Sequence, residues 1–426
     1  MSFPHRPELH FTADTGLLDS PAGVLYDKQS KSFHLFYEYQ EEPNKGFRWG
    51  HQVAQTPYTW TSCDDVLDDN CHGGAAVRSG EEIQLFFTTD KGIERASLPY
   101  SPTWGDYSEQ LDDSVTRQGL VPGLEKHRSP CVYSNPNGGW YMLTVNDQSH
   151  MDLFASTDCI NWEFVGPMSF DGEVGIDLDK LLLSPRMIRL EDEVDREGFD
   201  VLIATVGDTT GYIVGRTDGP RFTVRTPFTR LDWGHDFISP RMNHDAARFG
   251  IGCMIFGLMK DPRPIPDESE HWSNCLSLPR ALHLEGGIIY QVPASGLAKN
   301  ISFSTQAYLW TGFFHGIGEG ASITVELLDE KGTIGARVIC DSRSISLDRS
   351  VNPLHGPDDK PAVAPFVAEQ LSIITDGSTV EVYANGGRTT LASRVFFDGG
   401  ACTGFRVVTE GEAFVNHVST TGPKPF

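Results

Sequence analysis

Four Ser-Pro pairs draw attention, because a serine hydroxyl can do chemistry and because proline restricts where each pair can lie. Their serines are Ser20, Ser129, Ser184 and Ser239. Serine acts as a nucleophile only beside a general base, and otherwise its hydroxyl makes hydrogen bonds. Proline is tolerated at the first residue of a strand, and it holds the preceding residue in an extended conformation. The pairs therefore predict strand entries, whose serines serve as catalysts, as ligand-binding groups or only as strand-entry residues.

The spacing of the pairs predicts the elements that position them. Ser184 lies 55 residues after Ser129 and 55 residues before Ser239, and the 109 residues from Ser20 to Ser129 are close to two such steps. The missing station falls near residue 74, in the stretch CHGGAAV. Each station precedes an apolar segment, namely FHLFYEY, IQLFFTT, WYMLTV, FDVLIATV and GCMIFGLM. Multistranded repeats of this length are typical of a β-propeller.

The sequence therefore predicts an all-β protein with two domains. We expect a five-bladed β-propeller over residues 1–293 and a β-sandwich over residues 294–426. After residue 293 the repeat ends, and ASITVELLD, GARVICD and LSIITDGSTVEVYANGG alternate as strands with tight turns. Because equivalent positions of a closed repeat occupy equivalent places, the five stations should surround one end of the propeller axis and form a ligand site there.

Composition excludes several classes of partner. A formal net charge of -24 weighs against a nucleic acid or an anionic membrane, whereas a neutral sugar is compatible with it. No apolar run reaches the roughly 18 residues that span a bilayer, and MSFPHRPELHF lacks the apolar region of a secretion signal. The eight cysteines show no CxxC pair and no metal-ligand spacing. We therefore expect a cytoplasmic protein with reduced thiols, no metal and no cofactor.

Several stretches carry a resemblance to a known family. RPELHF, HLFYEYQ and WGHQVA lie in the first repeat, and HRSP, DLFASTDCINWEFVG, LDWGHDF and LPRALHLEGGIIYQVP follow later. DGSTVEVYANGG and SRVF lie in the C-terminal part. Together they resemble glycoside hydrolase family 32, which contains the invertases, levanases and inulinases. The resemblance covers nearly the whole chain and implies a five-bladed propeller, a C-terminal sandwich and a small carbohydrate ligand at the propeller axis.

The family's catalytic carboxylates correspond to residues that are not acids in this chain. Its motif Trp-Met-Asn-Asp-Pro-Asn-Gly, which contains the nucleophile, corresponds to LLDSPAG and places Ser20 at the nucleophile position. Its Arg-Asp-Pro motif, which contains a transition-state stabiliser, corresponds to RSP and places Ser129 at the aspartate. Its Glu-Cys-Pro motif, which contains the acid/base, corresponds to LSP and places Leu183 at the glutamate. The three catalytic positions are therefore substituted.

These substitutions predict a catalytically degenerate, carbohydrate-binding member of the family. Retaining glycosidases need two carboxyl groups about 5–5.5 Å apart, and leucine can transfer no proton. Losing one member of such a unit costs on the order of 10⁴–10⁶ in rate. Trp49 would offer an aromatic face to the sugar, and Arg128, Asp236 and Ser239 would offer hydrogen bonds. A scaffold for assembly that binds no ligand is a further possibility. It is disfavoured because Trp49 and Arg128 are retained.

The alternative is an active glycoside hydrolase or glycosyltransferring enzyme with relocated carboxylates. Asp19 precedes the substituted nucleophile, although strand alternation would point it away from the axis. Glu38 stands where the family has a glutamine in FYQYN, and Leu258 stands where it has a tryptophan. Asp177 and Asp179 lie in the loop before the third substituted position. A pair of these acids could act on a fructoside or on another glycoside.

Overall fold

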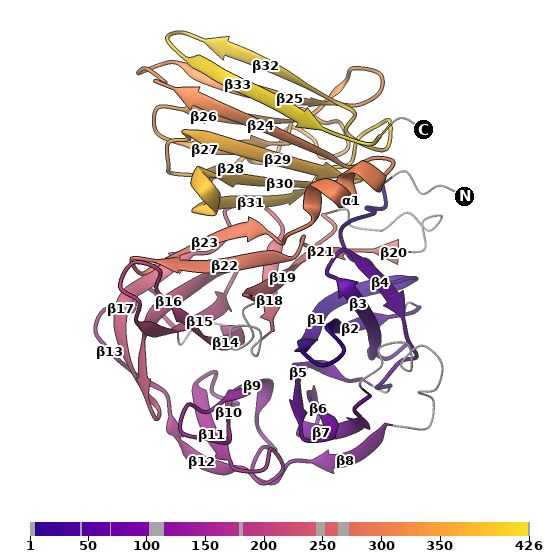
Figure 1. Ribbon diagram of the computed structural model, residues 1–426, viewed down its shortest axis with the longest axis vertical. Coiled ribbons are helices and arrows are strands. Elements are labelled where there is room, and N and C mark those ends of the chain that lie inside the picture. Colours follow the sequence, from indigo (N-terminus) through magenta and orange to yellow (C-terminus); the bar gives the residue numbers. More distant parts are fainter. Residues whose placement is uncertain are drawn as a thin grey trace.

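The computed structural model of the chain is made almost wholly of strands, which form a ring of sheets and a sandwich against one side of that ring (Figure 1). The structure describes residues 5–42, 45–68, 70–101, 115–178, 182–243, 252–262 and 272–424, with the backbone alone at residues 182 and 183. The predicted fold class, a five-bladed propeller followed by a β-sandwich, is confirmed within these residues.

Five sheets form the blades of the propeller in the described part of the chain. The innermost strands, which start at or beside the predicted stations, are β1 (Gly16–Asp27), β5 (His72–Ser79), β9 (Arg128–Ser134), β14 (Leu182–Glu191) and β18 (Phe237–Met242). The outer strands are β2 (Ser32–Gln40), β3 (Arg48–Thr56), β4 (Thr59–Ser62), β6 (Glu82–Thr89), β7 (Gly92–Pro99), β8 (Thr116–Leu120), β10 (Trp140–Val145), β11 (Met151–Ser156), β12 (Glu163–Pro167), β13 (Ser169–Asp171), β15 (Gly198–Val206), β16 (Thr209–Asp218), β17 (Arg221–Arg230), β19 (Cys253–Met259), β20 (Trp272–Ser273), β21 (Cys275–Leu276), β22 (Arg280–Glu285) and β23 (Ile288–Pro293).

The ring is closed by contacts between the last blade and the first. Each innermost strand contacts the next one along the chain, and β18 contacts β1. Short strand β20 also pairs in parallel with β1, with Trp272 opposite Gly16. Neighbouring blades cover both faces of a middle strand, which is why β2 and β19 read as nearly continuous apolar runs and are buried along most of their length.

A β-bulge interrupts the strand pairing near the stations. Pairing shifts between Leu183 and Arg186 in β14 and between Ile238 and Arg241 in β18. The Ser-Pro pairs predict extended serines, but three of these serines are left-handed. The φ angles are 55° at Ser129, 52° at Ser184 and 47° at Ser239. The bulge explains the difference, since an extra residue in one strand has to turn out of the ladder.

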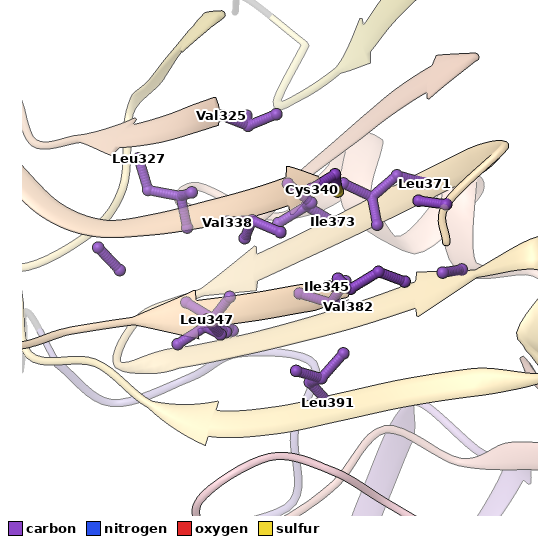
Figure 2. Close-up of a cluster of buried hydrophobic side chains, with 14 of the residues drawn as sticks. Val325, Leu327, Val338, Cys340, Ile345, Leu347, Leu371, Ile373, Val382 and Leu391 are labelled. Carbon is purple, nitrogen blue, oxygen red and sulfur yellow. The ribbon is translucent and has the colours of Figure 1, made fainter. Parts of the chain in front are cut away.

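Two five-stranded sheets form the sandwich (Figure 1). One sheet contains β24 (Tyr308–His315), β29 (Gln370–Asp376), β30 (Thr379–Ala384), β31 (Thr389–Arg394) and β33 (Phe414–Thr421). The other contains β25 (Ser322–Leu328), β26 (Ile334–Asp341), β27 (Ile345–Asp348), β28 (Ala362–Ala364) and β32 (Gly404–Glu410). Apolar side chains of alternate residues fill the space between the sheets, as Figure 2 shows. Helix α1 (Leu297–Phe303) connects the sandwich to the propeller, and a short 3₁₀ turn, η3 (Asn385–Gly387), joins β30 to β31.

A buried network of charged groups joins the sandwich to the propeller. The Arg280 guanidinium of the last blade donates to Glu381 of β30 at 2.7 Å and to Asp232 at 2.8 Å. His10 lies 3.1 Å from Glu381 and 2.9 Å from Asp376. These side chains are excluded from solvent. Although burial opposes it, the charge of Arg280 holds the pKa of Glu381 down at about 2. The two parts of the chain therefore share a buried polar interface.

Candidate functional site

A cavity of about 370 Å³ lies at one end of the propeller axis. The structure brings all five predicted stations together in its lining, as Ser20, Gly73, Ser129, Ser184 and Ser239. The left-handed turns at the stations are held by the blades behind them, because the backbone N–H of Ser129 donates to Thr88 Oγ1 at 3.0 Å. Ser239 repeats this bond, with its N–H 3.1 Å from Thr205 Oγ1. The repeat of the sequence is thus reproduced in the geometry of the site.

Asp19 lies in this lining, contrary to the expectation that it would face away from the axis. The pairing of β1 with β2 shifts between Leu18 and Ser20, so that Asp19 is the extra residue of a bulge. A bulge breaks the alternation of a strand, and consecutive side chains can then share one side. Asp19 and Ser20 consequently both reach the cavity.

Glu38 also lines the cavity, and both of its carboxylate oxygens are bound. Ser20 Oγ donates to Oε2 at 3.2 Å, and His72 Nδ1 lies 2.6 Å from Oε1. The Glu38 residue is only 2% exposed. The hydrogen bond to Glu38 and the negative charge of the carboxylate raise the pKa of His72, although burial opposes this. Glu38 and His72 are therefore held together as a polar pair at the wall of the cavity.

The electrostatic environment of Asp19 differs from that of an ordinary surface carboxylate. Burial is the main cause that raises the pKa of Asp19 to about 6, and the negative charge of Glu38 adds to it. The positive charges of Lys260, His72 and Arg241 act in the opposite direction. A carboxyl group with this pKa changes its protonation between pH 5 and 7, so the charge of the cavity changes in the same range.

The variant Asp19→Asn tests this assignment. The folded-state pKa lies above the unfolded value, so the wild type loses stability as pH rises from about 4 to above 6, whereas the variant does not. We expect urea unfolding at pH 8 to give the variant a free energy of unfolding about 3 kcal/mol higher than that of the wild type, and the two to match near pH 4. Asp218→Asn, on the exposed end of β16, serves as the control. An equal effect of the Asp19 variant at both pH values would contradict the shifted pKa.

Two residues predicted to bind substrate lie elsewhere. Trp49 has no exposed surface, because it packs against Phe87 in the core between the first two blades, and it cannot offer a face to a sugar. Asp236 is buried against the sandwich, where its Oδ2 accepts from Arg349 Nη1 at 2.6 Å and from the backbone N–H of Arg394 at 2.7 Å. Both predictions are therefore corrected. Both side chains are buried by contacts with distant parts of the chain, which short motifs do not reveal.

Other predicted residues divide into three groups. Arg128, Ser129 and Ser239 line the cavity, and burial lowers the pKa of Arg128. Leu183 contributes backbone pairing with β15, but its side chain lies outside the described residues. The alternative acids of the preceding loop do not join the cavity lining among the described residues: Asp177 is exposed, and Asp179 lies outside the described part of the chain.

The cavity also contains side chains that the motifs did not single out, namely His72, Arg241 and Lys260. A signal for Arg241 was present, because the tripeptide SPR occurs at residues 184–186 and again at 239–241, at the 55-residue spacing. His72 belongs to the second station, CHGGAAV. Lys260 follows β19 directly, and the sequence offers no comparable signal for it.

Metal chemistry and membrane insertion find no support in the described residues. No group of three or more histidine, cysteine, aspartate or glutamate side chains there could hold a metal ion. None of the helices described is long and apolar enough to cross a bilayer. The cytoplasmic location stays a prediction.

Comparisons with known proteins agree with this architecture. Residues 10–293 match the model of the glycosyl hydrolases family 32 N-terminal domain, and residues 333–421 match the family 32 C-terminal model. A sucrose-6-phosphate hydrolase of Bacillus subtilis is 30% identical over 333 residues, which are 68% of this chain and 66% of that protein. The chain therefore spans about two thirds of the length of this relative. A sucrose-6-phosphate hydrolase of Staphylococcus xylosus is 24% identical over 95% of this chain and 90% of its own length.

Solved structures show the same fold at low identity. The exo-inulinase of Aspergillus awamori superposes with a TM-score of 0.78, at 18% identity, over 99% of this chain and 98% of that one. A Bombyx mori β-fructofuranosidase mutant in complex with sucrose gives 0.76, at 20% identity, over 99% and 94% of the two chains. With both family models matched over most of its length, the chain belongs to glycosyl hydrolase family 32.

Proposed function

We propose that this protein binds a small carbohydrate in the axial cavity and does not hydrolyse the fructosides of its relatives. The observation that supports this most directly is the chemistry of the cavity lining. It offers hydroxyl groups and cationic side chains at the stations, including Ser20 and Ser129, where the family resemblance expects carboxylates. Concave sites with a few convergent polar groups are the usual form of a small-molecule site.

The positions of Asp19 and Glu38, the two carboxylates of the cavity lining, support a role in sugar binding rather than the two-step hydrolysis of a retaining glycosidase. A retaining glycosidase needs one carboxylate that can attack the anomeric carbon and a second that transfers a proton. Glu38 is almost fully buried, and both of its oxygens are already engaged, by Ser20 and His72. Asp19 is the carboxylate that keeps some exposure to the cavity. One accessible acid supplies proton transfer but not the pair that the family chemistry requires.

The backbone strain at the stations gives independent support for a ligand site. Three serines adopt the left-handed conformation, which is uncommon for residues other than glycine. Such outliers persist where surrounding structure enforces them, and they cluster at functional sites. Ser129, Ser184 and Ser239 all lie in the lining of one cavity.

A second candidate function rests on Asp19. Its pKa of about 6 suits a general acid near neutral pH. The negative charge of Glu38 helps to raise this pKa, as in enzymes whose two neighbouring carboxyl groups have different pKa values and different roles. An enzyme that used Asp19 as acid/base and Glu38 as nucleophile would have to release Glu38 from His72 first. This candidate predicts turnover of a glycoside by the wild type.

Binding can be measured by isothermal titration calorimetry with a panel of mono- and disaccharides. We expect a saccharide of the panel to bind, and Arg128→Met to weaken that binding about tenfold, because the variant removes a charged hydrogen-bond donor from the cavity. Arg216→Met, on the exposed surface of β16, should leave the affinity unchanged. Unaltered affinity in Arg128→Met, or no binding of any saccharide, would contradict the proposal.

A further inference from the structure

The inner wall of the axial cavity contains a buried guanidinium without a carboxylate partner. Arg241 is only 3% exposed, and its Nη1 donates to the carbonyl oxygens of Ser239 and Pro240 at 3.1 and 3.2 Å. In the described part of the chain, Nε and Nη2 of Arg241 make no hydrogen bond, and no carboxylate lies within ion-pair distance. Nη2 lies against Gly73, where a Cβ atom would be 2.8 Å away. The glycine leaves the space that this guanidinium occupies.

A second buried guanidinium adds to the positive charge behind this wall. Arg186, the counterpart of Arg241 in the preceding blade, is 1% exposed and donates to the carbonyl oxygens of Pro130, Pro185 and Gly74. Burial, together with the charge of Arg186, holds the pKa of Arg241 well below the usual range, although the negative charges of Glu38 and Asp19 oppose this. Buried charges are normally paired, and leaving one without a counter-charge is unfavourable. Two adjacent guanidinium groups that form no ion pair with a carboxylate of the described residues therefore favour an anion in the cavity beside them.

The charges of the lining leave a net positive potential in an otherwise acidic protein. Besides Arg128, the lining contains the cations Arg241 and Lys260 and the carboxylates Asp19 and Glu38. Glu38 is already compensated by His72 at 2.6 Å. Asp19 is then left to offset Arg241 and Lys260, in a chain whose formal net charge is -24. The excess of cations over carboxylates corresponds to one anionic group.

We propose that the carbohydrate bound by this cavity is an acidic sugar, whose single carboxylate is bound by Arg241 and Lys260. The inference rests on the proposed function and specifies its ligand. Arginine and lysine form charge-assisted hydrogen bonds with carboxylates, and these bonds strengthen in a site with little water. The hydroxyl groups at the stations would bind the remainder of the sugar, and the apolar side chains of Ile238 and Leu258 complete the lining.

Calorimetry with defined probes tests the proposal. D-glucuronate, D-galacturonate and D-gluconate are compared with D-fructose, sucrose and fructose 6-phosphate. We expect at least one of the three sugar acids to bind at least tenfold more tightly than the neutral sugars and than the sugar phosphate. Raising the salt concentration should weaken that binding, because an ion pair contributes to it.

Two variants assign the effect to the named residues. Lys260→Met should weaken binding of the sugar acid about tenfold and reduce its preference over the neutral sugars. Lys260 is an exposed residue, so we expect this variant to fold, and Lys299→Met in α1 is the matched control. Arg241→Met should abolish the preference for an acid, in a variant whose circular dichroism spectrum confirms that it is folded.

The outcomes separate this inference from the proposed function. Equal affinity for neutral and acidic sugars, or an unchanged preference in Lys260→Met and Arg241→Met, would overturn the inference and leave carbohydrate binding intact. Tighter binding of fructose 6-phosphate than of every sugar acid would overturn the assignment to a carboxylate. Failure of the whole panel to bind would overturn both proposals.

Discussion

Purified protein incubated with sucrose, inulin or levan should release fructose at least about 10⁴-fold more slowly than an active member of the family assayed beside it. The family resemblance predicts that Ser20 replaces the nucleophile, and of the two carboxylates in the cavity lining Asp19 is the less buried. Tight binding of a sugar cannot offset these losses, because uniform binding does not lower the chemical barrier. Chromatography of the products over a day provides the necessary sensitivity.

The decisive controls are the variants Asp19→Asn and Glu38→Gln. If the wild type hydrolyses any of these substrates and either variant abolishes that activity, the relocated-acid enzyme replaces the binding protein as the function. If a trace of activity persists unchanged in both variants, it comes from a contaminant. The double variant Ser20→Asp/Leu183→Glu restores acids at two family positions, and we expect weak rescue at most, since Leu258 and Ala22 alter the surroundings as well.

Arg280→Met should reduce the free energy of unfolding by about 3–5 kcal/mol, which is the usual effect of removing one partner from a buried ion pair. Arg280 donates to both Glu381 and Asp232, so the variant leaves two buried carboxylates without their main counter-charge. Urea unfolding followed by tryptophan fluorescence measures the change. Lys331→Met, which breaks an exposed pair with Asp398, is the control and should have no measurable effect.

The same network predicts how the free energy of unfolding depends on pH in the acidic range. The pKa of Glu381 is about 2 in the folded chain and lies below its unfolded value near 4.5. The group therefore stabilises the fold above about pH 4.5, and this contribution is lost as pH falls toward 2. Arg280→Met should flatten this part of the pH profile. Equal unfolding midpoints of the wild type and of Arg280→Met at pH 7 would contradict the role of the network.

The positions of the stations could be predicted from the sequence, whereas the directions of several side chains could not. Equal spacing of Ser129, Ser184 and Ser239 predicts equivalent places in a closed ring, and all three serines line one cavity. The prediction that the side chain of Asp19 faces away from the axis is wrong, because it assumes a regular strand. A one-residue bulge reverses the direction of the side chain. No local pattern distinguishes a bulged residue from its neighbours at this position.

Contacts between distant parts of the chain account for the remaining differences. Asp236 meets Arg349 of the sandwich, 113 residues away, so neither its burial nor its partner follows from the motif around it. Trp49 has the residue type of a sugar platform, but the second blade covers it completely. The repeated tripeptide SPR did contain information about the axis, since Arg186 and Arg241 occupy equivalent places in successive blades.

The surroundings of the station serines also determine which mutational paths remain open to this protein during evolution. Aspartate and asparagine adopt this backbone conformation more readily than other side chains, so residue 129, with a φ of 55°, can accept an aspartate without a change of backbone. Residue 20 differs, because its hydroxyl lies 3.2 Å from Glu38 and a carboxylate there would face a like charge. A lineage that gained an acid at residue 129 would therefore still need a compensating substitution at residue 38 before an acid at residue 20 could ionise freely.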